Sequence, residues 1–131
     1  MNQTIECVRD KKFIREFKSM SKICRTLSDD FVMFEKALTT YIKKYGRVPI
    51  EEYSQIKGLG NKFKCKAFVA KKFYCDQMKK KGWNSGFRIT FIYCPFDSTI
   101  HYIEIFFKGR KTKEDKGRIT KKCFDLEENF K

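Results

Sequence analysis

The sequence contains one histidine and two prolines, and it has no apolar run near the roughly 18–20 residues that a membrane-spanning helix needs. A single histidine leaves little room for a Ser/His/Asp triad, because such a triad needs a base whose pKa is near neutral. The six cysteines are scattered, with no two of them within four residues, so the close Cys or His pairs of a zinc site are missing. Neither a P-loop nor a GxGxxG motif is present, and Gly58-Leu59-Gly60 indicates only a turn. We therefore expect no metal site and no cofactor.

The beginning of the chain lacks the cationic and apolar regions of a secretory signal peptide. Disulfides are typical of exported proteins, so a chain without an export signal is expected to keep its thiols reduced. We therefore expect a cytoplasmic protein that does not enter membranes.

Positive charge is abundant and unevenly spread. Lys and Arg number 30 against 16 Asp and Glu, which gives a formal net charge of +14. Residues 57–88 carry 10 basic residues against Asp76 alone, whereas residues 89–107 have no Lys or Arg. A single lysine is ordinary solvated surface, but a stretch this basic favours a polyanionic partner, either nucleic acid or an acidic protein.

Hydrophobic periodicity and capping residues divide the chain into helices and strands. The expected elements are a strand over 5–8, a helix from Asp10, a second helix from Ser28 or Asp29 to Gly46, and strands over 62–69, 87–94 and 100–107. The last two strands are joined by a short turn and form an antiparallel hairpin. Residues 71–86 are expected to form an extended basic loop or a short helix.

This order of elements predicts a single α+β domain over residues 1–131, with its core at about 5–111. The N-terminal strand and the helical hairpin are expected to pack on one face of an antiparallel β-sheet. Residues 112–131 are expected to form a basic C-terminal tail or a short helix.

Five cations are expected on the predicted strands or directly beside them. Lys64 and Lys66 share one face of the first strand of the meander, Arg88 enters the second, and Lys108 and Arg110 follow the third. The start of the second strand adjoins the end of the third, so we expect these cations to converge at one end of the sheet. Fixed cations of this kind stabilise the extra negative charge that develops when an RNA 2′-hydroxyl attacks the neighbouring phosphate. The alternative is phosphate binding without cleavage, which composition alone favours.

Other residues are candidates for weaker roles. A hydrogen-bonded sheet histidine is the ordinary interpretation of His101, and a general acid/base role stays open. Further basic residues expected to contact nucleic acid are Lys62, Lys71, Lys72, Lys79, Lys80, Lys81 and Arg118.

Four segments, taken in order, resemble the RelE/ParE superfamily of toxins from type II toxin–antitoxin systems. They are Ile56–Gly60, Phe63–Lys66, Gly82–Tyr93 and Ile103–Gly109. With the preceding strand and helix pair, the resemblance covers roughly residues 5–111. It implies a RelE-like fold.

The resemblance also implies an activity. RelE-like members are metal-independent, ribosome-dependent mRNA endonucleases that inhibit translation and leave a 2′,3′-cyclic phosphate. Lys64 and Lys66 match the family's K-x-K motif, Arg88 matches the arginine of S-G-x-R, and Lys108 or Arg110 would supply the cation after the last strand. The chain departs from RelE because no tyrosine follows Tyr102. Either His101 or a lysine would then be the base, or the chain binds without cutting.

The implied partners are the ribosome, mRNA and a cognate antitoxin. The antitoxin would cover the basic stretch or the helix pair with an acidic or amphipathic segment, and operator DNA would be contacted only through the toxin–antitoxin complex. Two alternatives to an endoribonuclease stay open. One is a ParE-like inhibitor of DNA gyrase that acts by protein contact, and the other is a catalytically inactive module with the same fold.

Overall fold

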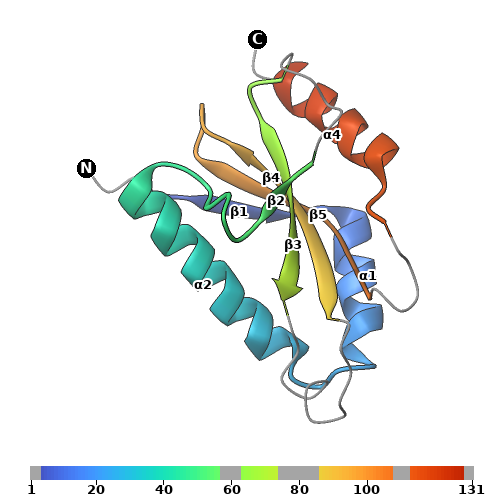
Figure 1. The fold of residues 1–131 in the computed structure, drawn as a ribbon. Coiled ribbons are helices and arrows are strands. Elements are labelled where there is room, and N and C mark those ends of the chain that lie inside the picture. The colour runs from blue at the N-terminus through green and yellow to red at the C-terminus, as the bar shows by residue number, and fades with distance from the viewer. Residues whose placement is uncertain (1–3, 57–62, 74–85, 108–112, 129–131) are drawn as a thin grey trace.

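A computed structural model describes residues 4–56, 63–73, 86–107 and 113–128, without the side chains of Lys72 and Phe73. Figure 1 shows a β-sheet with helices packed against it. The elements are β1 (Glu6–Arg9), α1 (Lys11–Ser21), α2 (Leu27–Tyr45), β2 (Ser54–Gln55), β3 (Lys66–Phe73), β4 (Phe87–Cys94), β5 (Thr99–Phe107) and α4 (Lys116–Glu128). The α+β class expected from the sequence is confirmed.

The strands form one mixed sheet in the order β1-β5-β4-β3-β2. β2, β3, β4 and β5 pair in antiparallel fashion, whereas β1 runs parallel to β5 with Cys7 opposite Ile100. The expectation of a purely antiparallel sheet is therefore wrong. Parallel neighbours need a long crossover connection, and here both helices and three strands separate β1 from β5 in the chain.

Helices α1 and α2 cover one face of the sheet with an aromatic core. Phe13 of α1 stacks on Tyr102 of β5 with ring centroids 5.5 Å apart, and Phe31 of α2 meets the same ring edge-on at 4.9 Å. Both phenylalanines and Tyr102 are fully buried. Helix α2 ends at Gly46, whose φ of 72° is the left-handed conformation that glycine adopts without strain. The periodic phenylalanines are thus core residues, as their helical spacing predicts.

Helix α4 covers the opposite face, which corrects the expectation of helices on one face only. Its buried residues Ile119 and Cys123 pack with Ala67 and Val69 of β3 and with Ile92 of β4. A second hydrophobic core therefore lies beneath a stretch that composition marked as polar. The spacing of Ile119, Cys123 and Leu126, which lie on one face of the helix, is the apolar signal of this packing.

An ion pair covers the edge of β5 where β1 ends. β1 pairs with β5 only as far as Tyr102, so the next residues of β5 have no neighbouring strand on that side. Glu16 of α1 accepts a hydrogen bond from the Ile105 backbone N–H at 3.4 Å, and Arg118 of α4 donates to the Ile103 carbonyl. The two side chains are joined to each other at 2.8 and 3.1 Å. This bidentate pair supplies hydrogen-bond partners for backbone groups at the exposed edge of the strand and connects α1 to α4.

The cysteines are not all reduced. Cys7, Cys65, Cys94 and Cys123 are free thiols, whereas Cys24 takes part in a disulfide. This corrects the expectation of six reduced thiols, since spacing along the chain does not reveal which cysteines meet in the fold. None of the helices in the described ranges is both long enough and apolar enough to cross a membrane.

Candidate nucleic-acid site

A cationic pocket of about 370 Å³ lies at the end of the sheet where β4 begins, on the face covered by α4. It is lined by Val69, Lys71, Arg88, Phe106, Lys113, Glu114 and Lys116. Four of these side chains are cations, and Glu114 is the one carboxylate among them. The pocket therefore carries a net positive charge next to two apolar side chains.

Backbone pairing and a hydrogen bond fix the position of Arg88 in the lining of this pocket. Arg88 is the second residue of β4 and lies directly opposite Phe106 of β5. Its Nη1 donates a hydrogen bond to the Lys71 carbonyl of β3 at 2.7 Å. The guanidinium is thus held between two strands, and it keeps further N–H donors for an anion.

The start of α4 supplies the other side of the pocket. The Asp115 backbone N–H donates to Oε1 of the buried Glu104 at 2.9 Å, and the Asp115 carboxylate accepts from the Arg118 backbone N–H at 3.1 Å as a helix cap. These contacts hold Lys113 and Lys116, on either side of Asp115, near Arg88. Sequence reasoning missed Lys113, Glu114 and Lys116. The only available signal was the charged run Lys111-Thr112-Lys113-Glu114-Asp115-Lys116 after the last strand.

Lys64 and Lys66 do not lie in this pocket, so their expected convergence with Arg88 is wrong. Lys66 is paired with Tyr93, five residues along β4 from Arg88, which corresponds to roughly 17 Å at the rise of a β-strand. Lys66 also shares the α1/α2 face with Phe68 and Ala70, while Arg88 lies on the α4 face. Antiparallel pairing is the reason, because it brings the start of β3 beside the end of β4 rather than its beginning.

The part of the expectation that concerns β4 and β5 is confirmed by their register. Phe87 pairs with Phe107, so the start of β4 adjoins the end of β5. The expected site residues Lys108 and Arg110 follow directly in sequence and lie outside the described residues, as do Lys62, Lys79, Lys80 and Lys81. Lys72 lies in β3, and its side chain is not described.

His101 lies away from the pocket. It pairs with Ile92, four residues along β4 from Arg88, or roughly 13 Å. Its Nε2 lies 3.2 Å from the Thr99 hydroxyl. A hydrogen bond from Cys65 is the largest cause that lowers the pKa of the Cys94 thiol. Burial opposes this effect, while a hydrogen bond and the charge of His101 add to it. His101 therefore takes part in a polar cluster in the second core.

Arg118, expected to contact nucleic acid, is held inside the protein by the ion pair with Glu16. Its side chain is 14% exposed. Burial alone would lower the pKa of this guanidinium, but the neighbouring carboxylates, above all Glu16, raise it. Among the residues expected to bind nucleic acid, Lys71 is the one whose described side chain lines the pocket.

The pocket is equipped to bind a phosphate. Its cations offer charge-assisted donors, and Phe106 offers an apolar surface beside them. In the parts of the chain that the structure describes, no group of three or more His, Cys, Asp and Glu residues is arranged to hold a metal ion.

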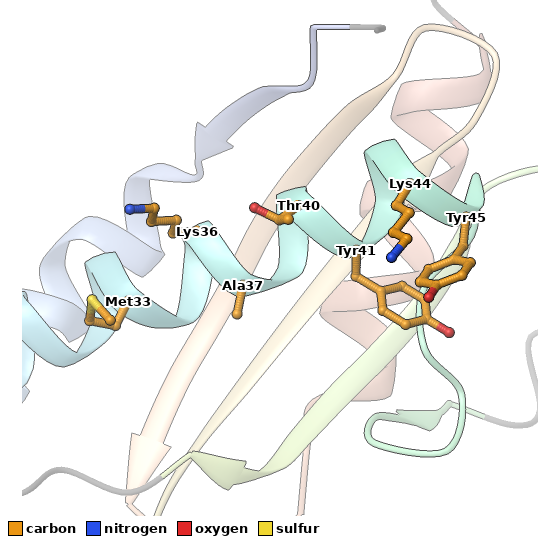
Figure 2. A pocket seen from close by; sticks show the side chains of 7 residues that line it. All are labelled: Met33, Lys36, Ala37, Thr40, Tyr41, Lys44 and Tyr45. Carbon is orange, nitrogen blue, oxygen red and sulfur yellow. The ribbon is translucent and has the colours of Figure 1, made fainter. Parts of the chain in front are cut away.

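A second surface lies on the outer side of α2 (Figure 2). It is a groove of about 450 Å³ lined by Met33, Lys36, Ala37, Thr40, Tyr41, Lys44 and Tyr45. Tyr41 and Tyr45 lie with ring centroids 4.5 Å apart, and the Lys44 ammonium is 5.3 Å from the Tyr45 ring. Met33 is 66% exposed, so this surface combines apolar side chains with positive charge.

Comparison of the chain with protein-family models, with curated proteins and with solved structures gave no match in any of the three.

Proposed function

We propose that this chain is the toxin of a type II toxin–antitoxin system and acts in the cytoplasm as a ribosome-dependent, metal-independent mRNA endonuclease. The observation that carries the proposal is the pocket whose lining groups Arg88 with three lysines and a single carboxylate: Lys71, Lys113, Lys116 and Glu114. Arg88 belongs to the S-G-x-R segment in which the sequence resembles RelE-like toxins. The pocket gives that arginine the cationic neighbours that phosphoryl transfer requires.

The proposed reaction is an intramolecular transesterification. An RNA 2′-oxygen forms a bond to the adjacent phosphorus while the bond from phosphorus to the 5′-oxygen breaks, which leaves a 2′,3′-cyclic phosphate and a 5′-hydroxyl. Arg88 and the pocket lysines stabilise the negative charge that builds up on the phosphoryl oxygens. Glu114 accepts the proton of the 2′-hydroxyl, and a lysine ammonium donates a proton to the departing 5′-oxygen.

This assignment replaces Lys64 and Lys66 as the source of the stabilising charge. The two lysines lie outside the pocket. They contribute instead to the overall positive charge, which attracts the ribosome and mRNA at long range. Glu114 takes the place of a tyrosine or His101 as the proton acceptor, since it alone among the residues that line the pocket is a carboxylate.

The test is translation of a defined mRNA in a cell-free extract, with mapping of the mRNA 5′ ends. The wild-type chain is expected to produce cuts that require ribosomes, and Arg88→Ala and Glu114→Gln are expected to lower the cutting rate by roughly 100-fold, the size typical of a lost general base or oxyanion donor. Lys36→Gln, on the far surface of α2, is the matched control and is expected to cut at the wild-type rate. Intact mRNA together with gyrase-cleaved DNA would instead identify a ParE-like inhibitor.

A module that binds RNA without cleaving it is the second candidate function. The separation of Lys64 and Lys66 from Arg88 favours it, because the K-x-K lysines and the arginine of the RelE motifs do not meet in one site. This candidate predicts that the chain slows translation while every mRNA remains whole.

The groove on α2 fits the expected antitoxin. An amphipathic helix could place apolar side chains against Met33 and Tyr41 and acidic side chains beside Lys36 and Lys44 (Figure 2). Met33→Glu is therefore expected to weaken neutralisation by the product of a neighbouring antitoxin gene, without changing mRNA cleavage. Operator DNA would be contacted only through that complex.

A further inference from the structure

A second cationic groove lies between α1 and α4, apart from the pocket that contains Arg88. Its volume is about 720 Å³. It is lined by Asp10, Lys11, Lys12, Arg15, Asp115, Gly117, Arg118, Lys121, Lys122 and Asp125. The contribution of α1 was not visible in the distribution of charge along the sequence, because the basic residues of α1 lie among acidic ones and outside the most basic stretch.

Internal ion pairs account for only part of this charge. Arg118 is paired with Glu16, and the Lys122 ammonium lies 3.5 Å from the Asp10 carboxylate. The Asp115 carboxylate caps α4. The remaining four cations of the lining are exposed and form no ion pair with any described residue. They are Lys11, Lys12, Arg15 and Lys121. Asp125 is the one remaining carboxylate of the lining.

The chemistry of the lining identifies the kind of partner. No apolar side chain lines the groove, whereas the centres of protein interfaces are built on aromatic and apolar anchors. The groove on α2 has such anchors and this one does not. Unpaired cations without anchors are suited to a sugar–phosphate backbone, which is bound through its charge.

The groove also has a fixed shape. The pair of Glu16 and Arg118 holds its floor to the backbone of β5, so α1 and α4 are tied to one strand. Lys11 and Arg15 are four residues apart on α1 and therefore lie about 6 Å apart along the helix axis, on one side of it. This spacing allows the two cations to contact neighbouring phosphates of one strand.

The pocket and the groove meet at the first turn of α4. Lys116 lines the pocket, while Gly117 and Arg118 line the groove. Gly117 places no side chain between the two sites. A polymer seated in the pocket can therefore continue over this turn into the groove.

We infer that the groove between α1 and α4 binds the backbone of single-stranded RNA that extends from the Arg88 pocket. The inference extends the proposed function, because it assigns to the same RNA a second contact surface. It concerns binding alone, so it can be measured without any cleavage.

The experiment measures fluorescence anisotropy of a labelled, unstructured 20-nucleotide RNA with the full chain carrying Arg88→Ala, which prevents cutting. In that background, Lys11→Gln, Arg15→Gln and Lys121→Gln are combined, and the charge-matched control combines Lys22→Gln, Lys43→Gln and Arg47→Gln, three exposed cations that line neither the groove nor the pocket. We expect the groove variant to bind the RNA roughly tenfold more weakly or worse. The slope of log K against log salt concentration should decrease in magnitude by about 2, since three cations are removed and each phosphate contact on a single strand contributes about 0.7. The control is expected to bind like the Arg88→Ala parent.

Equal losses in the two triple variants would overturn the inference, because the effect would then be one of net charge. Unchanged affinity and salt slope in the groove variant would overturn it as well. Circular dichroism at rising temperature shows whether both variants fold. Failure of the proposed function would appear separately, as wild-type protein that binds the RNA through this groove but does not cut mRNA in a translating extract.

Discussion

The ion pair between Glu16 and Arg118 is expected to be the strongest polar contribution to stability among the described residues. Arg118 is 14% exposed and Glu16 is 31% exposed at the side chain. Arg118→Met keeps most of the side-chain volume but removes the guanidinium. It leaves the Ile103 carbonyl without this donor and leaves Glu16 with only the long hydrogen bond from Ile105.

The cost can be bounded from these contacts. Breaking a fully buried pair costs about 3–5 kcal/mol, and a single hydrogen bond to a charged group contributes about 1.5–3 kcal/mol. Because Glu16 remains partly solvated, we expect Arg118→Met to lower the free energy of unfolding by about 2–3 kcal/mol. With 131 residues and about 2.1 cal/mol/K of unfolding entropy per residue, each kcal/mol lowers Tm by roughly 4 °C, so Tm should fall by about 8–12 °C.

A double-mutant cycle in urea supplies the test. Glu16→Met combined with Arg118→Met should cost clearly less than the sum of the single variants, because neither charge is then left without its partner. Lys121→Met, exposed on the same helix, should change stability by less than about 0.5 kcal/mol. Additive single effects, or a loss below about 0.5 kcal/mol for Arg118→Met, would refute the structural role and return Arg118 to the candidates for RNA contact.

Three further predictions concern stability. Gly46→Ala should lower the free energy of unfolding, measured by urea denaturation, by about 1 kcal/mol. The cause is backbone strain and not a clash, because φ is +72° at this position while no atom lies within 4 Å of the added Cβ. Burial raises the pKa of the Cys123 thiol from 9.0 to about 11, so the unfolded chain loses this proton at a lower pH than the folded protein does. The free energy of unfolding should therefore fall as pH rises from 9 to 11. A Cys123→Ala variant whose free energy of unfolding falls just as steeply over this pH range would contradict the prediction. The Arg9 guanidinium lies 5.1 Å from the Phe17 ring and 4.7 Å from the Phe31 ring, so Arg9→Gln should lower Tm by a few degrees, corresponding to about 0.5–1 kcal/mol; an unchanged Tm would show that these contacts contribute nothing.

Local patterns predicted the elements well where one physical signal dominates. The apolar stripe and the closing glycine predicted α2, and the β-branched runs predicted the hairpin of β4 and β5. Contacts between distant segments were not predictable in this way. The parallel pairing of β1 with β5 depends on a crossover through most of the chain, and the alternation in β3 could not show that both of its faces are buried.

The residues of the candidate site also differ in whether local sequence could predict them. Arg88 was predicted because its position at the start of a strand is local information. Lys113, Glu114 and Lys116 reach the pocket only because Glu104 and Arg118 hold the start of α4, and those contacts span segments with no shared sequence pattern. Lys66 was misplaced because its face and its end of the sheet depend on the pairing of β3 with β4.

The central claim is that the Arg88 pocket cleaves mRNA, and the most direct measurement compares cleavage rates of single variants in one translating extract. Primer extension on a fixed mRNA measures these rates. It compares Arg88→Ala and Lys113→Gln, which change the pocket, with Lys64→Gln and Lys66→Gln, which change the opposite end of the sheet. We predict a loss of roughly 100-fold for Arg88→Ala, about tenfold for Lys113→Gln, and less than about threefold for either lysine near β3. Cleavage that depends on Lys64 and Lys66 but survives Arg88→Ala, or no cleavage by the wild-type chain, would contradict the account.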